Sequence, residues 1–239
     1  MRWDTYDPEI REHAGLMPGG TDLVDALTAI MEFKPGQNVL DLCPGNGVVS
    51  ALVAKEFQVD VTSIVDEAEE EAQAEASAKL VGMSDRVRVI PGAPVAIPVP
   101  SDEFQRIFCI GQPFLPPPVS ELAKELYRVV SADGIVGLAG PAAMTNAIPD
   151  YMRDALEELG GIKLRTPAYT ALHFSHEGFH ILNAEFLPEA WDHWMAWLGS
   201  LQPEAISDKV RNAFLEDGGR WLSLGLIILR KPPRPGWAV

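Results

Sequence analysis

The sequence predicts an α/β fold, in which helices cover both faces of a mostly parallel β-sheet. Apolar segments of strand and helix type alternate between residues 21 and 138, the pattern of βαβ units. Hydrophobic residues make up 47% of the 239 residues, which is enough for a sizeable core. Because no repeat and no linker composition divides the chain, we expect a single domain over residues 1–239.

The expected elements follow from apolar periodicity and from the glycines and prolines between them. We expect helices at 21–32, 48–57, 66–80, 120–130, 150–159, 188–198 and 203–215. We expect strands at 38–42, 59–65, 86–90, 106–110, 135–138, 179–186 and 220–229. Thr21 is the expected N-cap of the first helix. Residues 162–176 show no clear period and receive no assignment.

The charge balance excludes some classes of partner. The chain carries 34 acidic and 19 basic residues, a formal net charge of −15. Such a surface repels phosphate backbones and anionic membranes, so neither nucleic acid nor membrane insertion is expected. Two cysteines cannot form a disulfide framework, and no signal peptide or membrane-spanning run occurs. These observations predict a cytoplasmic protein, with a homodimer as one possible oligomeric state.

The loop after the first expected strand is the most informative segment. An apolar strand ends in Asp41, turns through Gly45 and Gly47, and opens a helix. Glycines permit positive φ and let the backbone approach a ligand at the carboxyl ends of parallel strands. The alternative is a tight turn whose glycines serve sterics alone. Ser50 stands where a dinucleotide fingerprint needs its third glycine, and no phosphate-loop lysine follows, so neither of those sites is favoured.

The run from Val39 to Gly47 resembles the first motif of class I S-adenosylmethionine-dependent methyltransferases of the small-molecule type. Further segments resemble the same family in order and spacing: residues 16–21, 86–94, 125–134, 178–179 and 218–221. The resemblance implies a Rossmann-like, seven-stranded sheet. It also implies an N-terminal lid and helix over 1–33 and an acceptor-side insertion over 141–178, after the fifth strand.

The resemblance implies S-adenosyl-L-methionine as the cofactor and a small-molecule methyl acceptor of quinone-like, aromatic or amine type. Asp41 would organise the methionine end of the cofactor. The implied cofactor-binding residues are Gly20, Thr21, Asp41, Cys43, Pro44, Gly45, Asn46, Gly47, Val65, Asp66, Gly92, Ala93, Pro94 and Cys109.

Three departures from the family pattern motivate an alternative function, and one of them is Gln105 in place of the usual acid before the fourth strand. Val65 occupies the register of the ribose-binding acid, with Asp66 directly after it, and Ala93 replaces the acid beside the adenine. The alternative is a binding or assembly protein that keeps the fold without catalysis. A nicotinamide-dependent oxidoreductase is disfavoured by Ser50.

Methyl transfer is an in-line displacement that needs a general base only when the acceptor must lose a proton. His173 and His176 are the candidates for such a base, and surface or structural histidines are the alternative. No metal site is expected, because no third ligand accompanies the two histidines.

Two other groups of side chains leave alternatives open. Trp191, Trp194 and Trp197 recur every three residues, which is typical of a buried helix face or of an aromatic acceptor pocket. Cys43 and Cys109 stand at the ends of the expected first and fourth strands, which the resemblance implies are neighbours in the sheet, so their thiols either lie close together above the cofactor or fill tight turns.

Overall fold

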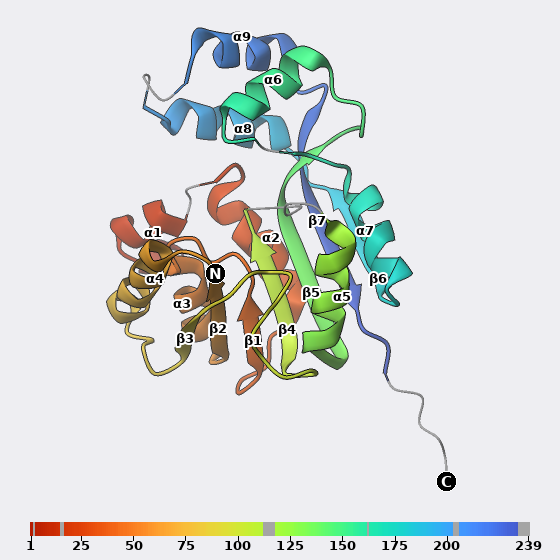
Figure 1. Cartoon of the computed structure of the whole chain (residues 1–239). Coiled ribbons are helices and arrows are strands. Elements are labelled where there is room, and N and C mark those ends of the chain that lie inside the picture. The colour runs from red at the N-terminus through yellow and green to blue at the C-terminus, as the bar shows by residue number, and fades with distance from the viewer. Residues whose placement is uncertain (2, 15–16, 112–117, 162, 203–205, 234–239) are drawn as a thin grey trace.

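In a computed structural model of the chain, the described residues are 1, 3–14, 17–111, 118–161, 163–202 and 206–233 (Figure 1). They contain a seven-stranded sheet of order β3-β2-β1-β4-β5-β7-β6. The strands are β1 (Asn38–Asp41), β2 (Asp60–Val65), β3 (Val87–Pro91), β4 (Phe104–Ile110), β5 (Val130–Ala143), β6 (His180–Phe186) and β7 (Leu222–Arg230). This topology confirms the expected Rossmann-like, mostly parallel sheet.

Strand pairing places the ends of β1, β2 and β4 side by side. β1 pairs in parallel with both neighbours, so that Asp41 lies opposite Ser63 on β2 and Phe108 on β4. β7 alone runs against its neighbours β5 and β6. The carboxyl ends of the parallel strands therefore meet at one edge of the sheet, where ligands of open α/β sheets bind.

Helices cover both faces of the sheet. α2 (Gly20–Met31), α3 (Val48–Phe57) and α4 (Ala68–Val81) pack on one face, and α5 (Val119–Val129) and α7 (Pro167–His176) on the other. Leu122, Leu126 and Val129 recur at helical spacing, which buries one side of α5. A short 3₁₀ turn, Trp3–Thr5, and α1 (Pro8–Ala14) precede α2.

Three further helices form a cap above the carboxyl end of β5 (Figure 1). They are α6 (Asp150–Glu158), α8 (Ala190–Ser200) and α9 (Asp208–Asp217). Trp194 is fully buried in the core of the cap, and its Nε1 donates to the Ser223 carbonyl of β7 at 2.9 Å. The Trp191 ring stacks on Phe214, and the Trp197 ring lies edge-on to Trp194. The tryptophans therefore build the interior of the cap.

Some elements differ from the expectation. Gly19, with φ of +96°, stands at the N-cap of α2, so Thr21 is not the cap. β5 begins at Val130 rather than at 135, and a register irregularity against β4 accommodates the turn. α9 begins at Asp208, and residues 203–205 lie outside the described residues.

The segment without an assignment contains α7. Thr166 accepts a hydrogen bond from the Tyr169 amide, and Pro167 occupies the first turn. The cap takes only α6 from residues 141–178, because α7 packs against α5, β6 and β7 instead.

Candidate functional site

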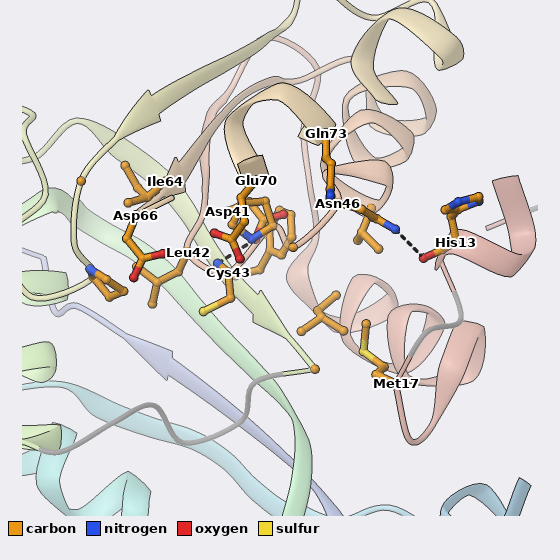
Figure 2. Close-up of a pocket in the computed structure, with 18 residues that line it drawn as sticks. His13, Met17, Asp41, Leu42, Cys43, Asn46, Ile64, Asp66, Glu70 and Gln73 are labelled. Atoms are coloured by element: carbon orange, nitrogen blue, oxygen red, sulfur yellow. Dashed lines mark hydrogen bonds between the residues drawn. The ribbon is translucent and has the colours of Figure 1, made fainter. Parts of the chain in front are cut away.

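A cavity of about 500 Å³ lies at the carboxyl ends of β1, β2 and β4 (Figure 2). The loop after β1 forms one wall, the start of α4 forms another, and the N-terminal segment closes a third. The lining residues are His13, Met17, Asp41, Leu42, Cys43, Pro44, Gly45, Asn46, Val49, Ile64, Asp66, Glu70, Gln73, Gly92, Pro94, Phe108, Ile110 and Gly111.

Asp41 is the buried acid of this cavity. It is 1% exposed, and its carboxylate accepts hydrogen bonds from the Ser50 hydroxyl at 2.5 Å and from the Cys43 amide at 3.2 Å. Burial raises the pKa of Asp41 from 3.8 to about 7, against the lowering influence of these two donors. A ligand that brings a positive charge to Asp41 stabilises its ionised form.

The two glycines of the loop serve different purposes. Gly45 has φ of +50°, and a Cβ built on it would meet nothing within 4 Å, so it opens directly onto the cavity. Gly47 has φ of +76°, and a Cβ there would lie 2.5 Å from the Cα of Ala74 on α4. Close packing of α3 against α4 therefore requires Gly47, whereas Gly45 leaves room for a ligand.

Asn46 ties the loop to the elements around it. Its Nδ2 donates to the His13 carbonyl at 3.1 Å (Figure 2), and its Oδ1 accepts from the Val48 amide at 3.1 Å. The Asn46 carbonyl accepts from the Ser77 hydroxyl of α4 at 2.6 Å. The loop is thus fixed on both sides without help from a ligand.

The N-terminal segment is anchored to the body of the domain. Trp3 Nε1 donates to Asp25 of α2 at 2.8 Å, and the Tyr6 hydroxyl donates to Glu56 of α3 at 2.6 Å. Neither aromatic side chain lines the cavity.

Met17 contacts the end of β4 from the N-terminal segment. A Cβ on Gly111 would lie 2.5 Å from the Met17 Sδ, so the thioether occupies the space that Gly111 leaves. His13 and Met17 both line the cavity, and the N-terminal segment therefore forms one of its walls.

The charges around the cavity have one sign. Asp41, Asp66 and Glu70 line it, and no lysine or arginine is among the described lining residues. Burial, and then the nearby Asp66 carboxylate, raises the pKa of Glu70. A cavity with this charge distribution suits a cationic ligand.

The structure brings together most of the implied cofactor-binding residues. Asp66 lines the cavity while Val65 is buried as the last residue of β2, so Asp66 takes the position expected of Val65. Gly92 and Pro94 line the cavity, but Ala93 does not. Four other implied residues lie outside the lining, namely Gly20, Thr21, Gly47 and Cys109.

The sequence interpretation missed several lining residues. Glu70 and Gln73 lie on the first turns of α4, where their acidic and polar neighbours suggest only a solvated helix face. Met17 and Gly111 come together across 94 positions of the chain, a juxtaposition that no local pattern reveals.

The two candidate histidines lie apart from the cavity. His173 and His176 are on α7, which packs against α5 and against β6 and β7. The His173 ring contacts Tyr169 edge-on at 5.0 Å, and neither histidine lines the cavity. His173 is half-buried and His176 is exposed, which is typical of surface histidines.

The two cysteine thiols are neighbours. A hydrogen bond with Cys109, followed by burial, raises the pKa of Cys43 well above its ordinary value. Cys43 lines the cavity and Cys109 lies buried behind it.

Two features are absent from the described residues. No group of three or more His, Cys, Asp and Glu side chains lies close enough together to hold a metal ion. None of the described helices has the length and apolarity that crossing a membrane requires.

Comparison with known proteins bears on the part of the chain that holds this cavity. Residues 39–134 match a family model described as a methyltransferase domain. The matched segment contributes the loop after β1, Asp66, Glu70 and the end of β4, and so most of the cavity lining.

Solved structures share the fold over most of the chain, the matched segment together with its flanking segments. A putative sarcosine dimethylglycine methyltransferase from Galdieria sulphuraria is 17% identical, with TM-score 0.74 over 88% of this chain and 84% of that one. Geranyl diphosphate C-methyltransferase from Streptomyces coelicolor A3(2), bound to Mg²⁺, geranyl-S-thiolodiphosphate and S-adenosyl-L-homocysteine, is 12% identical, with TM-score 0.77 over 89% and 76%. The [4+2]-cyclase SpnF is 19% identical, with TM-score 0.73 over 90% and 82%.

Proposed function

We propose that this protein transfers a methyl group from S-adenosyl-L-methionine to a small-molecule acceptor. The observation that carries the proposal is the cavity of about 500 Å³ at the end of β1, where buried Asp41 and open Gly45 meet. S-adenosylmethionine carries a sulfonium and an ammonium group, both of which suit a cavity lined by three carboxylates. The bound cofactor supplies an electrophilic methyl group.

The residues of the cavity fit the parts of this cofactor. Asp41 receives the ammonium at the methionine end, and Gly45 lets the backbone lie close to it. Asp66, at the carboxyl end of β2, receives the ribose hydroxyls. Gly92 and Pro94, which follow β3, border the adenine. The carboxyl ends of successive strands thus bind successive parts of one ligand.

The acceptor enters between the cofactor cavity and the cap of α6, α8 and α9. The walls of the domain hold the acceptor and the methyl group in line and exclude water, which is the main demand of the reaction. Amine, aromatic and quinone-like acceptors fit the absence of basic groups from the cavity lining better than anionic acceptors do. The similar fold of a putative sarcosine dimethylglycine methyltransferase, whose name refers to small amines, supports a small-molecule acceptor.

Titration calorimetry tests the proposal directly. S-adenosylmethionine and S-adenosylhomocysteine are expected to bind at micromolar concentrations, whereas a nicotinamide dinucleotide is not. Asp41→Asn is expected to weaken binding by about ten- to a hundredfold, because a charge-assisted contact is lost. Absence of binding to either adenosyl ligand at millimolar concentration would refute the proposed cofactor.

Transfer itself is measured with S-adenosylmethionine that carries a labelled methyl group. Label is expected to appear on one class within a panel of amines, phenols and quinols. Tight binding of the cofactor without transfer to any acceptor would instead indicate the alternative, a binding protein that keeps the fold.

A further inference from the structure

Three side chains form a buried chain of hydrogen bonds that ends at the cavity. Ser63 of β2 donates from its hydroxyl to Ser50 of α3 at 3.0 Å, and Ser50 donates to Asp41 Oδ2 at 2.5 Å. Ser63 is also the cross-strand partner of Asp41 in the β1–β2 pairing. Three separate elements therefore converge on one carboxylate.

Packing does not account for the hydroxyl of Ser50. Ser50 is fully buried, and the other buried residues of α3 are all apolar. A buried hydroxyl destabilises a fold unless it is hydrogen-bonded, and alanine would fill nearly the same volume. The hydroxyls of Ser50 and Ser63 make bonds that lead only toward Asp41.

The series of hydrogen bonds runs in one direction, from Ser63 through Ser50 to Asp41. Each serine hydroxyl has one proton, and Ser63 uses its proton on Ser50. Ser50 then directs its own proton at Asp41 Oδ2, while the Cys43 amide takes Oδ1. Both carboxylate oxygens are thereby fixed, and successive hydrogen bonds of this kind strengthen one another. The carboxylate keeps one orientation and retains lone pairs for a ligand in the cavity.

No lysine or arginine among the described lining residues is available to stabilise the ionised Asp41 carboxylate. The groups that act on its pKa are burial, the Ser50 hydroxyl and the Cys43 amide. The other titratable groups that line the cavity are His13 from α1, Cys43 from the loop after β1, Asp66 directly after β2, and Glu70 in the first turn of α4. Within the described lining, hydrogen bonds alone therefore stabilise the ionised carboxylate.

We propose that Ser50, oriented by Ser63, is a positioning residue that holds the Asp41 carboxylate in the orientation that receives the cationic end of the cofactor. The inference rests on the proposed function, since it takes the adenosyl cofactor as the ligand of Asp41. Ser50 acts through Asp41 and does not itself line the cavity. Position 50, where a dinucleotide fingerprint would have its third glycine, thus carries a functional hydroxyl in this chain.

The test is the pH profile of S-adenosylhomocysteine binding, measured by calorimetry between pH 5.5 and pH 8.5. In the natural protein, affinity is expected to rise with pH, with a midpoint near pH 7 and a plateau above about pH 8, as Asp41 becomes ionised. Ser50→Ala removes a hydrogen bond from the ionised form. We expect it to move the midpoint up by about one pH unit and to weaken binding about fivefold at pH 7, with a smaller deficit at pH 8.5. The amino group of the ligand titrates identically in both proteins, so it does not affect the difference.

Two further variants separate positioning from structure. Ser63→Ala leaves Ser50 in place but removes the hydrogen bond that orients the Ser50 hydroxyl. The midpoint of the pH profile is therefore expected to shift in the same direction as in Ser50→Ala, and by less. Ser77→Ala removes a hydrogen bond to the same loop, at the Asn46 carbonyl, without contact to Asp41. It is expected to weaken binding equally at every pH.

The outcomes distinguish the two proposals. Coincident midpoints for the natural protein, Ser50→Ala and Ser63→Ala would overturn the positioning role while the proposed function stands. Failure of the natural protein to bind S-adenosylhomocysteine at any pH would overturn both. If Ser50→Ala does not fold, the Ser63→Ala profile alone decides between a shifted and an unshifted midpoint.

Discussion

Gly47 lies against Ala74 so closely that a Cβ on the glycine would be 2.5 Å from the Ala74 Cα, a backbone atom that cannot move aside. Gly45, two residues earlier, faces open space. One glycine of the loop is thus required by the packing of two helices and the other by the ligand cavity. This difference can be measured.

Alanine at the two positions is expected to have opposite consequences. Gly47→Ala combines left-handed strain with a backbone clash and should destabilise the protein by more than about 3 kcal/mol. Gly45→Ala should cost only about 1 kcal/mol, but its methyl group enters the cavity and should weaken S-adenosylhomocysteine binding at least tenfold. Urea unfolding and calorimetry on both variants check this. Equal losses of stability would show that Gly47 is not confined as described.

Asp41→Asn should separate stability from binding. The pKa of Asp41 is raised by burial, so its ionisation destabilises the folded state increasingly as pH rises from about 4 through 7. Asparagine removes that penalty, and the variant should be more stable than the natural protein at pH 8, by up to about 4 kcal/mol. Near pH 4 the two should be alike. Thermal unfolding at both pH values measures the difference, and lower stability of the variant at pH 8 would contradict it.

Trp194→Ala should loosen the cap. The substitution removes a fully buried indole and its hydrogen bond to the Ser223 carbonyl, a loss of about 3–5 kcal/mol. Hydrogen exchange should accelerate in α6, α8 and α9, with less change in β1 to β4. Leu215→Ala, also in the cap but 64% exposed, is the matched control and should change stability by less than about 0.5 kcal/mol.

Met17→Ala should weaken ligand binding with little change in stability. Met17 is half-buried, lines the cavity and fills the space at Gly111, so its truncation opens the cavity to water. We expect about a tenfold loss of affinity for S-adenosylhomocysteine, measured by calorimetry. Met144→Ala is the control, because Met144 is exposed and does not line the cavity. An equal effect of both substitutions would exclude a specific role for the N-terminal wall.

Local patterns were sufficient to predict nearly every strand and helix of the first half. Apolar periodicity places β1, α3 and β2 within two residues of their observed bounds, because each element buries its own apolar face. α7 was not predicted because the apolar side chains of Tyr169 and Leu172 are exposed and the buried stripe includes the polar Thr170, although Thr166 and Pro167 give a standard helix start. Its burial is decided by α5 and the sheet rather than by its own sequence.

The part of the site that one continuous segment forms was predictable from the sequence. The part that residues distant in the sequence form together was not. The loop from Asp41 to Asn46 lines the cavity as expected, because the end of one strand positions it. The choice of Asp66 over Val65 depends on the residue at which β2 ends, and residue boundaries are the weakest part of such predictions. Met17 reaches the cavity only through long-range packing on Gly111.

The cap has a consequence for how such a protein diversifies. α6 follows β5, and α8 and α9 both lie between β6 and β7, so the cap consists of excursions from one rim of the sheet. Lengthening, trimming or replacing these excursions leaves every strand pair unchanged. The cap can therefore change in length and shape during evolution while the sheet and the loops at its carboxyl edge stay the same.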